Sequence, residues 1–417
     1  MVLKTLLNIC QKKALNRLEG CDNVFLTGVA GSGKSFLVRH FLKNKSQKTF
    51  PVLASTGASA ILVGGRTFHS FFGLGILQGG PLATIERALK NKRLVKRLRT
   101  TTGAIIDEVS MISGQTLAVA ETIARRALEK DLPWGGLKII AVGDFAQLPP
   151  VNRFGREKDW AFLSDSWLNS SFQSAVLKTV IRTKDPSLVE ILNHVRNGEL
   201  HPSVVGFLNE RKKTIPLNFE GTRLFPHRET AEHYNREQLS LISGPPSFFE
   251  TKYSGDEKFL SDIKKNAPLP ETLILKPGAL VMMRLNDPQG RWVNGSLGII
   301  KSIGEQSIKV TLFDGAIIEL EQVTFNILNA DGKEIASATN FPVNLAYATT
   351  IHKAQGLTLD QVAVDLKNLW EPGQAYVALS RVKSREGLYI TDWSPSSLKS
   401  DPEVSNFNKR VWDEDKT

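Results

Sequence analysis

The chain has 417 residues, a length that predicts two to four domains at about 150 residues each. Hydrophobic residues make up 41% of the chain and charged residues 23%, so ordinary cores can form, and disordered or collagen-like classes are excluded. The net charge of +11 favours a polyanionic partner, of which nucleic acid is the commonest, although solubility alone could explain it.

The sequence also argues against a membrane protein and a disulfide-stabilised protein. No apolar run approaches the ~20 residues that cross a bilayer. The N-terminal stretch leads into charged residues rather than a small-residue cleavage site, so we expect no targeting signal. Two cysteines are too few for a disulfide framework or a four-cysteine zinc site. We therefore expect a cytoplasmic location, either at a nucleoid or in a host cell.

The first half of the chain alternates short β-rich runs with helical stretches, which is typical of parallel sheets covered by helices. The predicted strands there are residues 23–27, 52–55, 104–107 and 138–142. A second alternating region begins near Val176, with predicted strands at 222–225, 361–365 and 388–391. Between Lys276 and about Asn340, turn pairs such as Asn294-Gly295 separate β-branched runs, which predicts a small inserted antiparallel barrel. The predicted fold class is α/β.

The strongest chemical motif is GVAGSGKS, which fits the phosphate-loop pattern G-x-x-x-x-G-K-[ST] between a predicted strand and a predicted helix. Backbone N–H groups of glycines can close around phosphate oxygens, and the helix N-terminus adds a favourable dipole. Lys34 would contact the β- and γ-phosphates, and the Ser35 hydroxyl would bind Mg²⁺. A chance glycine-rich turn is disfavoured by the flanking elements. The predicted phosphate-binding residues are Gly28, Ala30, Gly31, Ser32, Gly33, Lys34 and Ser35.

Two further strand ends carry polar residues of the kind that phosphoryl transfer needs. Asp107 and Glu108 end the apolar run AIIDEVSM, and we predict that both help to hold Mg²⁺. Glu108 would also position and deprotonate the attacking water, whereas an isolated acidic pair would more often be a solvated turn. Gln147 lies on a turn stiffened by Pro149 and Pro150, where its amide could sense the γ-phosphate. A proline-terminated strand is the alternative there.

In order and wording, these segments resemble the superfamily-one DNA helicases of the Pif type (the Pif-one family), relatives of RecD. The likeness runs from Gln11 to about Trp393. Besides the phosphate loop it includes residues 54–75, 105–114, 133–151, 346–360 and 376–382, among them ASTGASAILVGG, IIDEVSM, AVGDFAQLPPV, AYATTIHKAQG and YVALSRV.

The resemblance implies two RecA-like domains that bind ATP and Mg²⁺ between them, with single-stranded DNA across both. It implies 5′-to-3′ movement and unwinding of forked duplex DNA, in DNA repair, recombination, replication or telomere maintenance. G-quadruplexes and RNA–DNA hybrids stay open as substrates, and we expect a monomer.

The resemblance also implies roles for three residues outside the phosphate loop. Gln11 matches the glutamine that reads adenine, and a side-chain amide has the donor and acceptor that an adenine edge requires. Arg182 and Arg381 match arginines that reach across the cleft to the γ-phosphate, where a planar guanidinium suits the developing charge. A surface ion pair is the alternative for Arg182. Thr183 stands where the family commonly has Gln, which puts the nucleotide contact of that Gln in doubt.

DNA contacts are expected from turns in both RecA-like domains, where hydroxyl, imidazole and ammonium groups suit phosphate oxygens. The matching positions are Thr56, Thr67, His69 and Ser70 in the first domain, and His352, Lys353 and Gln355 in the second. Phe68, like Phe71 and Phe72, could stack on a base or act as a wedge, with core packing as the alternative. The basic run 90–99 could face DNA or solvent.

The expected domains follow from the resemblance. Residues 1–64 and 96–175 would form the first RecA-like domain, interrupted at 65–95 by a small insertion with a strand-separating pin. Residues 176–275 and 341–417 would form the second, interrupted by a barrel like that of Src-homology-3 domains at 276–340.

Two other functions remain open at this point. One is an ATP-driven single-strand translocase or remodeller that unwinds little duplex. The other is a nucleic-acid-binding clamp that ATP switches without being hydrolysed.

Overall fold

The structure is a computed structural model, and it describes residues 7–46, 48–62, 65–75, 77, 79–150, 158–216, 219–328 and 334–415. Within this part of the chain, two compact units are found. Unit 1 contains the described residues up to Arg182 and those from Ser400 onward, and unit 2 contains most of the residues between. Gly64 and Val151, which end two of the segments named above, lie outside the described residues.

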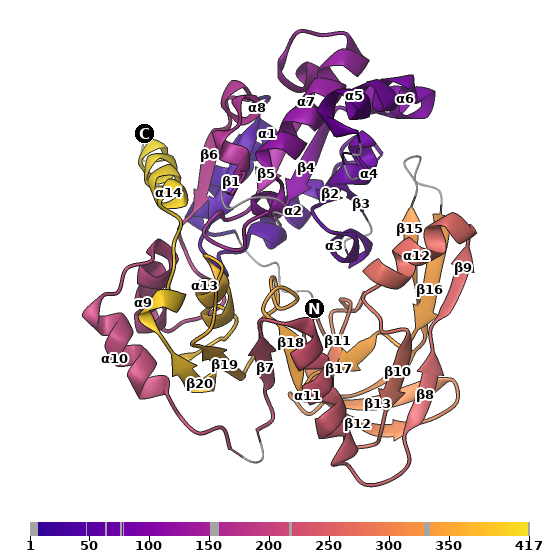
Figure 1. Cartoon of the computed structure of the whole chain (residues 1–417), viewed down its shortest axis with the longest axis vertical. Helices are drawn as coiled ribbons and strands as arrows, with labels where there is room; N and C mark the ends of the chain where they lie inside the picture. Colours follow the sequence, from indigo (N-terminus) through magenta and orange to yellow (C-terminus); the bar gives the residue numbers. More distant parts are fainter. Residues whose placement is uncertain are drawn as a thin grey trace. The chain divides into compact units, whose positions relative to one another are not determined.

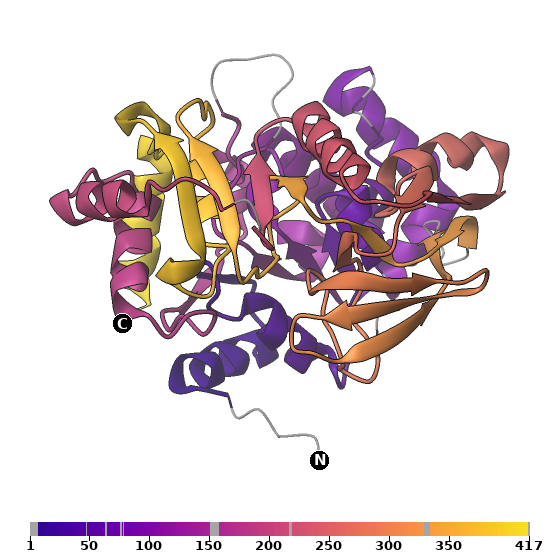
Figure 2. The same cartoon turned by 90° about the horizontal axis from the view of Figure 1, so that it is seen from below.

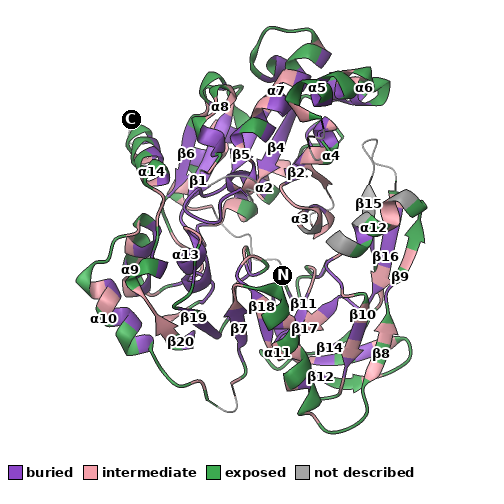
Figure 3. Cartoon of the chain, in the orientation of Figure 1, coloured by how far each residue is buried: buried purple, intermediate pink, exposed green. Residues whose placement is uncertain are grey.

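Unit 1 is built on a six-stranded parallel sheet in the order β3-β2-β4-β5-β1-β6 (Figure 1). Its strands are β1 (Val24–Gly28), β2 (Val52–Ala54), β3 (Arg66–Thr67), β4 (Gly103–Asp107), β5 (Lys138–Val142) and β6 (Gln173–Leu177). Side chains of successive strand residues point to opposite faces, and both faces of this sheet are apolar. The strands are correspondingly buried throughout most of their length (Figure 3).

Helices supply the apolar cover on each face. Val24 and Leu26 of β1 share one cluster with side chains of α1 (Ile9–Glu19) and α2 (Lys34–Leu42). Phe25 points the other way, toward Trp167 and toward Phe407 of α14 (Pro402–Glu414). The remaining helices of unit 1 are α3 (Gly57–Leu62), α4 (Phe68–Phe72), α5 (Gly80–Lys90), α6 (Lys92–Thr100), α7 (Gly114–Leu128) and α8 (Asp165–Asn169).

Unit 2 contains a four-stranded parallel sheet in the order β18-β7-β19-β20. Its strands are β7 (Thr222–Phe225), β18 (Ala348–Thr350), β19 (Val362–Leu366) and β20 (Leu388–Trp393). The associated helices are α9 (Pro186–Asn197), α10 (Pro202–Arg211), α11 (Arg228–Ser240) and α13 (Gln374–Leu379).

A separate antiparallel region is inserted between β7 and β18 (Figure 2). Its largest sheet has the order β14-β13-β12-β11-β17, and Ile308, Val310 and Leu312 alternate into its core. The bounds are β8 (Ser247–Glu250), β9 (Lys252–Gly255), α12 (Glu257–Asn266), β10 (Thr272–Leu275), β11 (Leu280–Met283), β12 (Leu297–Ile303), β13 (Ser307–Leu312), β14 (Ile317–Glu321), β15 (Val323–Leu328), β16 (Glu334–Asn340) and β17 (Val343–Leu345). The predicted antiparallel insertion is therefore found, while its likeness to a Src-homology-3 barrel stays a prediction.

Four expected boundaries need correction. The strand at 173–177 pairs with β1, so the second alternating region does not begin at Val176, and the units divide after Arg182. Residues from Ser400 belong to unit 1, because Phe407 stacks on Phe162 of that unit. The β insertion begins at Ser247 rather than 276 and extends past 340. Residues 65–95 do not form a separate unit, since β3 pairs with β2 in the main sheet.

Phe407 provides a test of the C-terminal helix assignment. Its ring is 7% exposed and stacks on Phe162 with 4.3 Å between ring centroids. We expect Phe407→Ala to reduce the stability of unit 1 by about 3–5 kcal/mol, because a buried aromatic side chain leaves a cavity. Phe407→Leu should cost less. Urea unfolding followed by tryptophan fluorescence checks this, and unchanged unfolding in both variants would contradict the assignment of α14 to unit 1.

Candidate nucleotide and nucleic-acid sites

The phosphate-loop motif forms the turn between β1 and α2. A Cβ added at Gly28 would lie 2.4 Å from the Leu177 carbonyl oxygen, so only glycine fits there. The Lys34 ammonium group lies under the loop and donates to the carbonyl oxygens of Gly28, at 2.8 Å, and of Val29, at 3.3 Å. The strand, the glycine turn and the helix N-terminus have the arrangement that binds phosphate groups.

Asp107 and Glu108 lie at the carboxyl end of β4, which β5 separates from β1 in the sheet. Burial raises the pKa of Asp107, while the hydrogen bond from the Glu108 N–H and the charge of Lys34 act in the opposite direction. Lys34 is therefore close enough to influence this carboxylate. Glu108 has a φ of 52°, a left-handed conformation that is costly for a residue with a Cβ and is found often at functional sites.

The residues present fit a magnesium ion bound together with phosphate groups. Ser35 and Asp107 offer a hydroxyl and a carboxylate oxygen, which are donors that Mg²⁺ prefers. Within the described ranges, no group of three or more His, Cys, Asp or Glu side chains could form a closed metal cage. Such an ion would therefore depend on phosphate oxygens and water for the rest of its coordination.

Gln11 lies against the phosphate loop, as its predicted role requires. Its side chain is 3% exposed, and its Oε1 accepts a hydrogen bond from the Asn8 N–H at the start of α1. Its Nε2 has no hydrogen-bond partner among the described residues, and a Cβ on Gly33 would lie 2.8 Å from it. A buried amide donor without a protein partner suits an acceptor atom on a nucleobase.

Arg182 also lies at the loop, and it does so as part of unit 1. Its backbone N–H donates to the Gly31 carbonyl oxygen at 3.2 Å, and a Cβ on Gly31 would lie 2.6 Å from the Arg182 Cβ. The expectation that Arg182 reaches across from the second domain is therefore corrected. Thr183, which begins unit 2, accepts a hydrogen bond from the Asp185 N–H through its hydroxyl.

Sequence reasoning did not single out Ile181, the residue before Arg182. Its backbone N–H donates to the Gly31 carbonyl oxygen at 2.8 Å, and its side chain is 53% exposed beside Gly33. An exposed apolar side chain next to the amide of Gln11 can contact a nucleoside. Its position directly before a predicted phosphate-contacting arginine was the available signal.

Gln147 and Arg381 are both buried. Gln147 lies in the turn after β5, where its N–H donates to the Asp144 carbonyl oxygen at 2.9 Å. Arg381 belongs to unit 2, where its guanidinium group donates to the carbonyl oxygens of Val377, Ala354 and Leu357. These bonds attach Arg381 to the turn that follows β18.

That turn carries the three residues predicted to contact DNA from unit 2. The His352 Nε2 lies 3.6 Å from a Glu371 carboxylate oxygen. Lys353 is an exposed residue. Even so, partial burial of its ammonium group and the positive charge of Arg228 lower the pKa of Lys353. The Gln355 N–H donates to the His352 carbonyl oxygen at 3.2 Å, which closes the turn.

The predicted DNA contacts of unit 1 lie at the edge of the sheet that carries Asp107. Ala54 of β2 pairs with Asp107 on one side and with Thr67 on the other, so the three residues form one row. Thr56 and Thr67 accept hydrogen bonds from the N–H groups of Ser59 and Ser70, the latter an exposed residue. Burial lowers the pKa of His69, so its imidazole is neutral at neutral pH.

The prediction that Phe68 stacks on a base needs correction. Its side chain is fully buried and packs on Phe72, which in turn contacts Trp134. We therefore assign Phe68 to the core and not to base stacking. The basic run is partly structural as well, because the Arg97 guanidinium donates to the Phe71 carbonyl oxygen at 2.5 Å and lies over the Phe71 ring. The other basic side chains of α6 are exposed (Figure 3).

The contact between Gly33 and Gln11 predicts the effect of a single methyl group. Gly33 has a φ of 91°, which costs an alanine about 1–2 kcal/mol, and the new Cβ would displace the Gln11 amide. We expect Gly33→Ala to weaken ADP binding by about tenfold or more, measured by titration of a fluorescent ADP analogue. Gly79 has a φ of 82° before α5, so Gly79→Ala is the matched control. Equal binding by the two variants would contradict the site.

Comparison with known proteins identifies the family of the chain. The family model for PIF1-like helicases matches residues 6–202. A protein of Bdellovibrio bacteriovorus named ATP-dependent DNA helicase Pif1 is 50% identical over 400 residues, which cover 96% of this chain and 91% of that protein. The zebrafish (Danio rerio) protein named ATP-dependent DNA helicase PIF1 is 34% identical over 96% of this chain, which spans 63% of its length.

Solved structures agree with the sequence relatives. Pif1 of a Bacteroides species, in complex with ADP-AlF4, matches with a TM-score of 0.85 and 28% identity, covering 98% of both chains. A second structure, Bacteroides Pif1 bound to ssDNA, matches with a TM-score of 0.68 and the same identity and coverage. The extent of these matches over both chains leads to one conclusion: the chain belongs to the PIF1-like helicase family.

Proposed function

We propose that this chain is an ATP-dependent DNA helicase that moves 5′-to-3′ on single-stranded DNA and separates forked duplex DNA. The observation that carries the proposal is the row formed by Thr67, Ala54 and Asp107 across three neighbouring strands. Thr67 is a predicted DNA contact and Asp107 a predicted ligand in the ATP site, and Ala54 alone lies between them in this row. A shift of β2 relative to either neighbour would disturb both sites together.

Each residue at the loop has a proposed part in ATP hydrolysis. Lys34 binds the β- and γ-phosphates, Glu108 orients and deprotonates the attacking water, and Gln147 senses the γ-phosphate. Arg182, beside Gly31, and Arg381 of unit 2 stabilise the charge that develops on the phosphoryl oxygens. Mg²⁺ held by Ser35 and Asp107, with Glu108 nearby, would neutralise phosphate charge when bound.

In unit 2 we propose that Arg381 links the nucleotide to DNA. Its guanidinium donates to the carbonyl oxygens of Ala354 and Leu357, which flank Gln355 in the turn with His352 and Lys353. A phosphate that attracts this guanidinium competes with those carbonyls. The conformation of the DNA-contacting turn would then depend on the state of the nucleotide.

The wider setting is also part of the proposal. Residues 65–95 would carry the strand-separating pin, and the exposed basic side chains of α6 would assist DNA binding. We propose a monomer that acts in the cytoplasm on single-stranded and forked DNA during repair, recombination, replication or telomere maintenance. G-quadruplexes and RNA–DNA hybrids are further candidate substrates. No helix in the described ranges is long and apolar enough to span a membrane.

Lys34→Ala tests the phosphate loop. Loss of the ammonium charge should lower DNA-stimulated phosphate release by about 100-fold or more, the range for losing a key transition-state donor. Lys43, exposed just after α2, provides the control variant Lys43→Ala, which should retain normal turnover. Phosphate release by the Lys34 variant at the normal rate would show that the loop is wrongly assigned.

Unwinding of matched duplexes with 5′ or 3′ single-stranded tails tests the function itself. We expect ATP-dependent strand separation of the 5′-tailed and forked substrates, and little separation of the 3′-tailed duplex. Hydrolysis and movement on single strands without separation would favour the translocase. Nucleotide-dependent DNA binding with no phosphate release at saturating single-stranded DNA would favour the switched clamp.

A further inference from the structure

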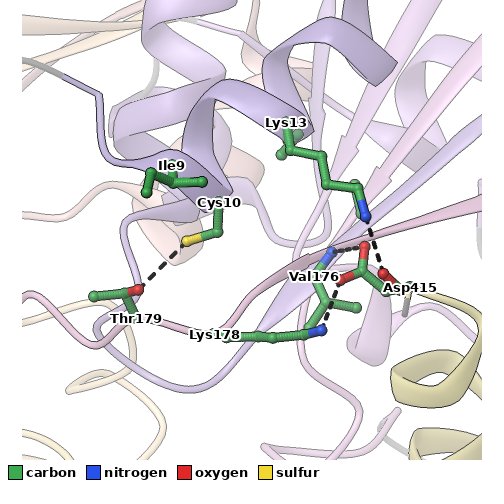
Figure 4. Close-up of a pocket in the computed structure, with 9 residues that line it drawn as sticks. Ile9, Cys10, Lys13, Val176, Lys178, Thr179 and Asp415 are labelled. Atoms are coloured by element: carbon green, nitrogen blue, oxygen red, sulfur yellow. Dashed lines mark hydrogen bonds and ion pairs between the residues drawn. The ribbon is translucent and has the colours of Figure 1, made fainter. Parts of the chain in front are cut away.

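Asp415, just after α14, contacts the edge strand β6 of the unit 1 sheet, the residue that follows that strand, and helix α1 (Figure 4). One carboxylate oxygen lies 2.6 Å from Arg17 Nη1 of α1, and the other lies 3.0 Å from the Lys178 ammonium nitrogen. The Val176 N–H, on β6, also donates to this carboxylate. Lys13 of α1 donates to the Asp415 backbone carbonyl oxygen at 3.0 Å.

This cluster is unlike an ordinary surface ion pair. The Asp415 side chain is 7% exposed and that of Arg17 is 22% exposed, so both lose much of their contact with water. Burial alone would raise the pKa of Asp415, but hydrogen bonds from Lys178 and Arg17 lower it overall. The carboxylate is therefore ionised at neutral pH. Removing a buried charge that pairs with two cations leaves those cations poorly compensated.

The cluster acts on the helix that carries Gln11. Helix α1 has 11 residues, with Gln11 in its first turn against Gly33 and with Lys13 and Arg17 further along against Asp415. A short helix moves as one body, so its position on β6 sets where the Gln11 amide lies relative to the loop. A hydrogen bond to a nucleobase tolerates displacements of only about 0.5 Å.

A cavity of about 270 Å³ lies beside the cluster. It lies between α1 and the chain that follows β6, and Cys10, Lys13, Thr179 and Asp415 are among the residues that line it (Figure 4). Open space beneath α1 leaves room for the helix to tilt once the carboxylate is removed. Ala14 and Leu18 pack α1 on the sheet, Arg17 also donates to the Ser174 carbonyl oxygen, and the bonds of Asp415 add to these contacts on the side where the cavity lies.

We propose that Asp415 is a positioning residue for base recognition: by holding α1 on β6, it fixes the Gln11 amide where it reads the nucleobase of ATP. The proposal rests on the proposed function, and specifically on the role of Gln11. Asp415 touches no nucleotide itself. Its effect should appear in the choice between bases and not in the chemistry at the γ-phosphate.

The test compares Asp415→Asn with wild type in DNA-stimulated hydrolysis of ATP and of GTP, using the full chain. We expect KM for ATP to rise about 3- to 10-fold, equivalent to about 0.7–1.4 kcal/mol. We expect kcat at saturating ATP to stay within about twofold and KM for GTP to change little. Selectivity for ATP over GTP therefore falls. Asp131→Asn is the matched control, because Asp131 is 96% exposed and pairs with Arg125 on the surface of unit 1.

Gln11→Ala and the double variant separate the possible failures. If the proposal is right, Gln11→Ala loses the same selectivity, and Asp415→Asn adds nothing further in that background. Equal losses for ATP and GTP in Asp415→Asn, or a lower melting temperature with unchanged selectivity, would reduce Asp415 to a structural residue and overturn the proposal. Unchanged selectivity in Gln11→Ala would overturn the base-reading role, while helicase activity in the same preparation keeps the proposed function.

Discussion

Parallel pairing of β1 with β5 and β6 is the constraint on which the rest of unit 1 depends. Parallel strands all end at the same edge, so every turn that leaves a carboxyl end meets there. The phosphate loop, Asp107 and Thr67 lie at this edge because each stands at the carboxyl end of a strand of the parallel sheet. Apolar strands buried on both faces hold that edge in place, and its polar residues can therefore be arranged closely.

At this edge, neighbouring groups offset the effect of burial on the charge of Asp107. Asp107 would bind protons more readily in its buried position, and the Glu108 N–H and the Lys34 ammonium group oppose that tendency. Lys34 itself donates to two carbonyl oxygens of the loop, so its charge is held near the place where phosphate would lie. The side chains of Gln11 and Ile181 both lie beside Gly33. Gln11 comes from the start of unit 1, and Ile181 comes from the segment after β6. The fold therefore brings together two residues, Gln11 and Ile181, that are 170 positions apart in the sequence.

Local patterns predicted the sheet strands and the phosphate loop well, because both depend on short-range periodicity and glycine spacing. The strands at 138–142 and 222–225 have the predicted bounds, and the other predicted strands differ by a few residues at most. The prediction that the second alternating region begins near Val176 was wrong, because an apolar run does not specify the distant strand with which it pairs. Phe68 could not be assigned from its neighbours, since burial of its ring depends on Phe72 and Trp134. The place of the C-terminal helix likewise depends on long-range stacking at Phe407.

The guanidinium group of Arg381 donates to the backbone carbonyl oxygens of Val377, Ala354 and Leu357 and to the Ser380 hydroxyl. A charged phosphate oxygen would attract this guanidinium group more strongly than a neutral carbonyl oxygen does, because hydrogen bonds between charged groups are the stronger ones. The planar guanidinium offers five N–H donors in a fixed fork, whereas a lysine ammonium group is a compact charge with three donors. Once the phosphate leaves, Arg381 would bond to the carbonyl oxygens of Ala354 and Leu357 again. The proposed change in the turn is therefore reversible, as an enzyme needs after every turnover.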